Sequence, residues 1–282
     1  MKLGLLANTG RPGAEAAISE ILNWAGKAGV EVVILSDGGA PTSGGNLVSE
    51  AELVRKSDTV VALGGDGTIL RTARAVGGSQ KPILGVNIGG LGFLAELSNQ
   101  NVPAALEALK KGEYRLEERM VLQAELKGQK HFALNDVVVE KGEVRRLLRL
   151  TLSANGEYIC SYASDGLIFA TPTGSTAYSL SVGGPIINPK MNLIIAAPIS
   201  PHSLVSRPLI FEPEDVLELS LSHPGKEAIL TVDGQVSVKM NSAERLEVRR
   251  APHTIHLIRF KESSFYQVLR TKLHWGILPG EK

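Results

Sequence analysis

The residues best suited to chemistry in the first half of the chain are one aspartate and the glycines around it. An apolar run, Val60-Val61-Ala62-Leu63, leads directly into Gly64-Gly65-Asp66-Gly67-Thr68. Glycines let the backbone turn sharply and let a ligand approach main-chain N–H groups, and the N-terminus of a following helix favours an anion. We therefore predict a phosphate site in this turn, formed by Gly64, Gly65, Gly67 and Thr68.

A carboxylate placed among phosphate-binding amides repels phosphate unless it has a task of its own. Asp66 is suited to two tasks: accepting a proton from a substrate hydroxyl, or holding a Mg²⁺ ion that also contacts the phosphates. Arg71, expected on the first turn of a helix over Thr68–Val76, is placed to offset the charge and reach a phosphate. The spacing is that of neither a P-loop nor GxGxxG. The alternative is a glycine-rich turn in which Asp66 only caps a helix.

A second group of polar residues follows a strand predicted over Leu167–Ala170. The run Thr171-Pro172-Thr173-Gly174-Ser175-Thr176 is rich in hydroxyl groups, and Thr173 or Ser175 can cap a helix over Thr176–Val182. Small hydroxyl residues beside the flat ring of Tyr178 suit a purine, and Asp165 can accept from an exocyclic amine or a ribose hydroxyl. A capped helix with a core tyrosine and a turn aspartate is the alternative.

Asn135 and Asp136 lie inside the apolar, strand-like run Phe132–Val139. Strand alternation sends one to each face, and a buried polar pair is costly without partners. A ribose with two hydroxyls would satisfy both side chains, whereas an exposed strand end or bulge is the alternative. Gly89, Gly90 and Gly92 follow another predicted strand, and they form either a second backbone cradle or a tight connection.

Strands and helices alternate over the first hundred residues, which predicts a parallel sheet flanked by helices. Ligands in such sheets bind at the carboxyl ends of the strands. Later segments alternate apolar and polar residues between turn signals, which predicts a mostly antiparallel, all-β domain, built as a sandwich. We therefore expect an α/β domain over 1–100, to which 263–282 return, and a β-rich domain over 101–262. The Gly/Pro/Ser-rich stretch Asp37–Asn46 is expected to be a surface loop.

Composition excludes several classes of protein. The 282 residues carry 30 Lys and Arg against 29 Asp and Glu, which argues against a nucleic-acid partner. No apolar window is long enough for a membrane helix, and the N-terminus is too short in apolar residues for a signal peptide. The single cysteine, Cys160, favours a cytoplasmic protein, and no spacing indicates a dedicated metal site.

Taken together, these segments resemble the NAD kinase family. The resemblance rests on motifs that occur in the family's order between about residues 58 and 235, and the most specific is Asp165 through Pro185. The others are Gly64-Gly65-Asp66-Gly67-Thr68, Asn135-Asp136, Pro201-His202 through Arg207-Pro208, and Asp233-Gly234-Gln235. The resemblance implies transfer of a terminal phosphoryl group, from ATP or polyphosphate, to the 2′-hydroxyl of the adenosine ribose of NAD.

The same resemblance implies roles for individual residues. Asp66 would accept the proton of the ribose hydroxyl, and Mg²⁺ would accompany the phosphoryl donor. The active species would be a homo-oligomer, a dimer or tetramer formed through the second domain. The residues implied to bind NAD are Asp66, Gly67, Arg71, Asn135, Asp136, Arg146, Asp165, Thr176, Ala177, Tyr178, Ser179, Leu180, Ser181, Ser200 and Gln235.

Two other functions compete with this one. A related lipid or sugar kinase explains Gly64 through Thr68 but leaves Asp165 through Pro185 without a use. A non-catalytic dinucleotide-binding sensor keeps the adenosine-binding segment but has no need of Asp66.

Overall fold

The computed structural model describes residues 1–35, 46–90, 92–98, 102–142, 147–222, 227–260 and 264–273. The chain divides into two units, Met1–Glu118 with Ile255–Lys282, and Arg119–Thr254. These bounds differ from the expected division at 100/101 and 262/263. The reason lies in the hydrogen bonding, because strands β7 (Arg115–Arg119) and β20 (Ile255–Arg259) join the sheet of the first unit. The stretch 37–45, expected to be a loop, lies outside the described residues.

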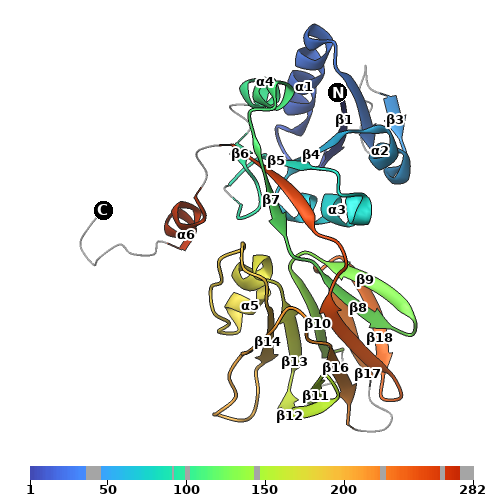
Figure 1. Cartoon of the computed structure of the whole chain (residues 1–282), viewed down its shortest axis with the longest axis vertical. Coiled ribbons are helices and arrows are strands. Elements are labelled where there is room, and N and C mark those ends of the chain that lie inside the picture. Colours follow the sequence, from blue (N-terminus) through green and yellow to red (C-terminus); the bar gives the residue numbers. More distant parts are fainter. Residues whose placement is uncertain are drawn as a thin grey trace, which may run out of the picture. The chain divides into compact units, whose positions relative to one another are not determined.

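The first unit is built on a mostly parallel sheet with the strand order β3-β2-β1-β4-β5-β20-β7, and β6 pairs with β5 (Figure 1). Strands β1, β2, β3, β4, β5, β6 and β20 form parallel pairs. The remaining strands of this sheet are β1 (Lys2–Ala7), β2 (Glu31–Leu35), β3 (Asn46–Val48), β4 (Thr59–Gly64), β5 (Ile83–Asn87) and β6 (Leu97–Ser98). The parallel arrangement confirms the α/β fold predicted for this part of the chain.

Helices cover both faces of this sheet. Helix α1 (Ala14–Ala28) packs with α4 (Val102–Lys111), and α2 (Glu50–Lys56) packs with α3 (Asp66–Val76). Leu3 and Leu5 of β1 share one apolar core with residues of α1 and α4. The described part of this unit also contains α6 (Phe265–Leu273), whose Leu269 is fully buried. The buried strands read as continuous apolar runs because both faces of the sheet are covered.

The start of α3 differs from the expectation, whereas α2 begins at Glu50 because Ser49 and Glu52 form a reciprocal capping box. The helix expected from Thr68 begins at Asp66, directly after Gly65. Arg71 therefore lies in the second turn of α3 and not in the first.

The second unit consists of two six-stranded antiparallel sheets. One has the order β15-β14-β13-β10-β17-β18 and the other β12-β11-β16-β19-β8-β9. Their strands are β8 (Leu122–Leu126), β9 (Gln129–Ala133), β10 (Asp136–Lys141), β11 (Leu148–Ala154), β12 (Glu157–Ser164), β13 (Gly166–Ala170), β14 (Ile194–Ile199), β15 (Leu209–Phe211), β16 (Leu217–Leu221), β17 (Glu227–Val232), β18 (Val236–Asn241) and β19 (Arg245–Arg250). Alternate residues of both sheets, such as Leu150, Phe169 and Leu219, form one apolar core between them. The antiparallel β-domain is confirmed.

Two details of the second unit differ from the expectation. The run Phe132–Val139 is not one strand, because β9 ends at Ala133 and β10 begins at Asp136. The helix expected over Thr176–Val182 is a 3₁₀ turn at Thr173–Thr176 followed by the short α5 (Tyr178–Ser181), and neither has a side-chain cap. In the part of the chain that the structure describes, no helix combines the length and hydropathy needed to cross a bilayer.

Candidate active site

Asp66 lies at the carboxyl end of β4, as the first residue of α3. Its carboxylate accepts two main-chain hydrogen bonds, from the Phe93 N–H at 2.9 Å and from the Leu94 N–H at 3.1 Å. Each oxygen accepts one of these bonds and keeps a further lone pair. The side chain is half-buried, and the neighbouring Gly67 is exposed. A carboxylate held in this way has a fixed direction, and its oxygens can still accept a hydrogen bond from a substrate hydroxyl.

Gly92 makes this arrangement possible. A methyl group on Gly92 would lie 2.1 Å from the Asp66 Oδ1 atom, closer than any van der Waals contact. Gly92 therefore leaves the space that the Asp66 carboxylate occupies, a role that the sequence did not indicate. The loop is also tied to the turn itself, since the Ile88 N–H donates to the Gly64 carbonyl at 3.0 Å.

The other residues of the turn have distinct surroundings. Thr68 is 7% exposed, and its hydroxyl lies so close to Gly64 that a methyl group there would be 2.2 Å away. The Thr68 side chain therefore packs against Gly64 and supports the turn. Arg71 forms an ion pair with Glu50 of α2 at 3.6 Å.

Arg11 is a cation beside this turn that the sequence analysis missed. Its guanidinium donates to the Ile88 carbonyl at 3.3 Å, and methyl groups on Gly65 and Gly89 would lie 2.9 and 3.2 Å from it. The side chain is exposed. The sequence contained a signal for this residue. Arg11 closely follows the first predicted strand, and ligands of parallel sheets bind at the carboxyl ends of the strands.

The polar residues of the second unit gather at a bend between β9 and β10. Asp233, in the turn between β17 and β18, accepts hydrogen bonds from the N–H groups of Leu134, Asn135 and Asp136 at 2.8–3.0 Å. These three bonds replace strand pairing, which explains why Asn135 and Asp136 do not alternate across one strand. Asp233 belongs to the motif Asp233-Gly234-Gln235, and its carboxylate organises this bend.

The hydroxyl-rich segment crosses the same bend. Thr171 donates its side-chain hydroxyl to the Leu134 carbonyl at 2.6 Å and its N–H to the Asn135 carbonyl at 2.9 Å. A methyl group on Gly174 would lie 2.1 Å from the Asn135 carbonyl oxygen. The Ser175 hydroxyl donates to Pro172 and accepts from the Ile187 N–H. These tertiary contacts explain why the segment forms a 3₁₀ turn and not the expected capped helix.

A cavity of about 330 Å³ opens beside this crossing. Its lining combines the carboxylates of Asp136, Glu140 and Asp233 with the aromatic side chain of Tyr178. Tyr178 is 39% exposed, which is high for a large aromatic residue. The lining residues are Asn135, Asp136, Val138, Glu140, Ala177, Tyr178, Thr231, Asp233 and Gly234. Such a cavity offers acceptors for hydroxyl or amine donors and one flat apolar surface.

Asp136 has the most perturbed carboxyl group in this cavity. Burial, together with the nearby negative charge of Asp233, raises its pKa from 3.8 to about 7, although the Tyr178 N–H bonds to the carboxylate and opposes the shift. Burial and the carboxylates of Glu140, Asp136 and Asp165 likewise raise the pKa of Tyr178. Asp165 pairs with Lys141 at 2.6 Å.

The structure brings together only part of the predicted dinucleotide site. Asn135, Asp136, Ala177 and Tyr178 line the cavity. Thr176, Leu180, Ser181, Ser200 and Gln235 do not line it, and Ser179 is fully buried with its hydroxyl unpartnered among the described residues. Arg146 lies outside the described residues. Within the described ranges, no three His, Cys, Asp or Glu side chains converge as ligands for a metal ion.

Comparison with known proteins shows the family. A glycine-rich turn carrying an oriented carboxylate and a separate polar cavity together describe a protein that binds a phosphate-bearing ligand and a hydroxyl-bearing one. The model of the ATP-NAD kinase N-terminal domain matches residues 3–114, and that of the C-terminal domain matches residues 134–260. The chain belongs to the NAD kinase family, which confirms the resemblance found in the sequence.

Individual relatives agree with this assignment. An NAD kinase of Moorella thermoacetica is 40% identical, with 98% of this chain and 90% of that protein covered. An NAD kinase of Geotalea daltonii is 36% identical, with 98% and 99% covered. The crystal structure of an Archaeoglobus fulgidus NAD kinase in complex with ATP aligns with a TM-score of 0.78 at 26% identity, covering 97% of this chain and 99% of that one. The crystal structure of yeast NADH kinase complexed with NADH has the same fold, with a TM-score of 0.91 at 24% identity, covering 100% and 90%.

Replacing Gly92 with alanine tests how Asp66 is held. We expect Gly92→Ala to displace the Asp66 carboxylate and to speed hydrogen exchange at the Phe93 and Leu94 amides, because the added methyl group occupies the place of Oδ1. Gly90→Ala is the matched control, since no atom lies within 4 Å of a methyl group at that position. Equal exchange rates in the two variants, measured by mass spectrometry of peptides covering the loop, would contradict this account.

The raised pKa of Asp136 predicts a dependence of stability on pH. Folded Asp136 keeps its proton up to about pH 7, whereas the unfolded chain loses it near pH 4. Folding therefore binds a proton between these values, and this group's contribution falls by about 1.4 kcal/mol per pH unit as the pH rises. Urea unfolding of the wild type and Asp136→Asn should diverge with this slope, and parallel curves would show that Asp136 is not protonated in the folded state.

Proposed function

We propose that the chain transfers a terminal phosphoryl group from ATP or polyphosphate to the 2′-hydroxyl of the adenosine ribose of NAD, giving NADP. The observation that carries this proposal is the Asp66 carboxylate, held by the Phe93 and Leu94 amides at the N-terminus of α3. Membership of the NAD kinase family supports the choice of substrates.

Asp66 acts as the proton acceptor in this reaction. The ribose oxygen forms a bond to the terminal phosphorus while the bond from that phosphorus to the bridging oxygen of the donor breaks. The hydroxyl proton passes to Asp66. A ribose hydroxyl is a poor nucleophile at neutral pH, so a positioned carboxylate is useful even when it is a weak base. The two main-chain hydrogen bonds already hold the Asp66 side chain in one orientation, so the carboxylate does not have to reorient for the reaction.

The donor phosphates bind at the glycine-rich turn. Main-chain N–H groups at the start of α3, an 11-residue helix, favour an anion there. The Arg11 guanidinium next to Gly65 and Gly89 supplies positive charge that offsets Asp66. A Mg²⁺ ion would arrive bound to the donor phosphates, and it would neutralise charge on the transferred group.

The dinucleotide uses the cavity of the second unit. Asn135 and Asp136 accept hydrogen bonds from a ribose or from the adenine edge, and the exposed ring of Tyr178 offers a stacking surface. We expect further contacts to the dinucleotide from Asp165, Thr176, Leu180, Ser181, Ser200 and Gln235. Support comes from the cavity lining and from the carboxylates that face Tyr178.

A dinucleotide sensor without catalysis is the competing function. It would use the same cavity, and the oriented carboxylate of Asp66 would have no task in it. A lipid or sugar kinase would use the turn but not the cavity beside Tyr178. Both alternatives predict no NADP from NAD and ATP.

An assay of NADP formation with the Asp66→Asn variant tests the proposal. We expect the wild type to form NADP from NAD and ATP in the presence of Mg²⁺ and to stop when EDTA is added. Asp66→Asn should lose at least about 100-fold in kcat, because the proton acceptor contributes about 10²–10⁴-fold. Binding of NAD, followed by calorimetry, should persist in this variant.

The matched control for Asp66→Asn is Asp58→Asn, at the opposite end of β4, where the carboxylate is 64% exposed and should leave kcat unchanged. If the folded wild type binds NAD but forms no NADP with ATP, polyphosphate is the next donor to test. If the folded wild type forms no NADP with either donor, the kinase proposal is wrong and the sensor function is favoured.

We also propose that the chain works in the cytoplasm as a homo-oligomer formed through the β-rich unit. Leu204 and Val205 are 94% and 84% exposed and Ile210 is 54% exposed, which is unusual for large apolar side chains. Light scattering at the assay concentration should report a dimer or tetramer. Leu204→Asp with Val205→Asp should reduce the mass, and an active monomeric wild type would contradict the proposal.

A further inference from the structure

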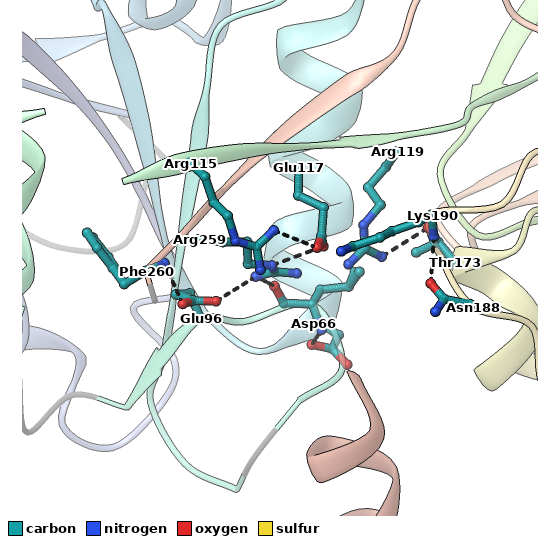
Figure 2. Close-up of polar contacts among 11 residues, drawn as sticks. Asp66, Glu96, Arg115, Glu117, Arg119, Thr173, Asn188, Lys190, Arg259 and Phe260 are labelled. Carbon is teal, nitrogen blue, oxygen red and sulfur yellow. Dashed lines mark hydrogen bonds and ion pairs between the residues drawn. The ribbon is translucent and has the colours of Figure 1, made fainter. Parts of the chain in front are cut away.

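Arg259, the last residue of β20, is buried between two carboxylates (Figure 2). Its Nη1 atom lies 3.2 Å from Glu96, and its Nε atom lies 3.2 Å from Glu117. The side chains of Arg259, Glu96 and Glu117 are only 6%, 3% and 11% exposed. Burying three charges is costly, and such clusters are weak contributors to stability compared with apolar packing. Their presence in the sheet therefore calls for another explanation.

The cluster is one step away from Asp66. The Arg259 Nη1 atom donates to the Leu94 carbonyl at 2.9 Å, and the Leu94 N–H donates to the Asp66 carboxylate at 3.1 Å. Leu94 is thus held on both sides, by the cation on its carbonyl and by the carboxylate on its amide. A shift of this residue moves the atom that orients Asp66.

Glu96 anchors the other end of the same loop. Its carboxylate accepts from the Phe260 N–H at 2.7 Å, and its own N–H donates to the Gly85 carbonyl at 3.0 Å. The loop between Ile88 and Glu96 is therefore tied at its start to β4, through Gly64, and at its end to β5 and β20. Between these two ends, the Arg259 guanidinium adds a side-chain bond to the Leu94 carbonyl, opposite the bond that the Leu94 N–H makes to Asp66.

We propose that Arg259 is a positioning residue for Asp66, acting through the Leu94 backbone. This inference rests on the proposed function of Asp66 as proton acceptor. Arg259 does not contact the substrates in this account; it limits the positions of Leu94, and Leu94 limits those of the carboxylate. An error of about 1 Å in a reacting group can cost about 100-fold in rate. The guanidinium is suited to the task because its fork bonds two carboxylates and a carbonyl at once.

The test compares Arg259→Lys with Arg115→Met. Arg259→Lys keeps the charge but loses the fork, so it cannot bond Glu96, Glu117 and Leu94 together. Arg115 pairs with the same Glu117 at 3.3 Å, is 46% exposed, and makes no contact with Leu94 among the interactions described (Figure 2). We expect Arg259→Lys to lower kcat about 10- to 100-fold with the KM values for NAD and ATP within about twofold. Arg115→Met should match the wild type.

Two further measurements separate positioning from a merely structural role. Hydrogen exchange of peptides covering 88–96 should accelerate in Arg259→Lys, under conditions where circular dichroism shows a folded protein. In an Asp66→Asn background, Arg259→Lys should cause no further loss of kcat, because its effect passes through Asp66. If Arg259→Lys does not fold, Glu96→Gln replaces it, since Glu96 also holds Arg259 against the loop.

The outcomes are distinct for the two proposals. The positioning role is overturned if the kcat losses of Asp66→Asn and Arg259→Lys multiply in the double variant. It is also overturned if a folded Arg259→Lys has an unchanged kcat although its loop exchanges faster. Both results leave the function of Asp66 intact. Full activity of Asp66→Asn overturns the proposed function itself, and the role of Arg259 falls with it. A loss of kcat in Arg115→Met equal to that in Arg259→Lys assigns the effect to the charge cluster and also overturns the inference.

Discussion

The bond between the Asp66 carboxylate and the backbone of Phe93 and Leu94 is the constraint on which the first unit's site depends. It joins the turn after β4 to the loop after β5, so the two glycine-rich segments at the carboxyl edge of the sheet form one structure. A carboxylate beside a helix N-terminus is usually a cap. Here it bonds the amides of a neighbouring loop, and it thereby ties that loop to the start of α3.

A carboxylate that bonds main-chain amides also shapes the second unit. The Asp233 carboxylate accepts hydrogen bonds from the three main-chain N–H groups of the bend at 134–136, and these bonds separate β9 from β10. The bend turns Asn135 and Asp136 into the cavity beside Tyr178. A cluster of carboxylates with a half-exposed aromatic ring is expensive to maintain in an unliganded protein. Donor groups of a nucleoside would relieve that cost, since each carboxylate oxygen accepts more than one hydrogen bond.

Sequence reasoning succeeded where a signal is local. The apolar runs and the helical spacing predicted the α/β unit, the alternating segments predicted the antiparallel unit, and the order of motifs identified the family. It failed at the bend after β9 and at α5, because hydrogen bonds to residues far along the chain decide both. Asp233 lies about a hundred residues from the bend that it stabilises, and no local pattern reports such a bond.

The amino-acid sequence by itself determined the class of each unit, the turn that carries Asp66, and the membership of a kinase family, because periodicity and glycine spacing are local properties. Only the tertiary structure decided which groups hold that aspartate. Gly92 and Leu94 contact it from 26 and 28 positions further along the chain, and Arg259, which bonds the Leu94 carbonyl, lies 193 positions from residue 66. The physical reason is that a parallel sheet brings the ends of sequence-distant strands to one edge, and the contacts made there depend on packing that no single segment contains.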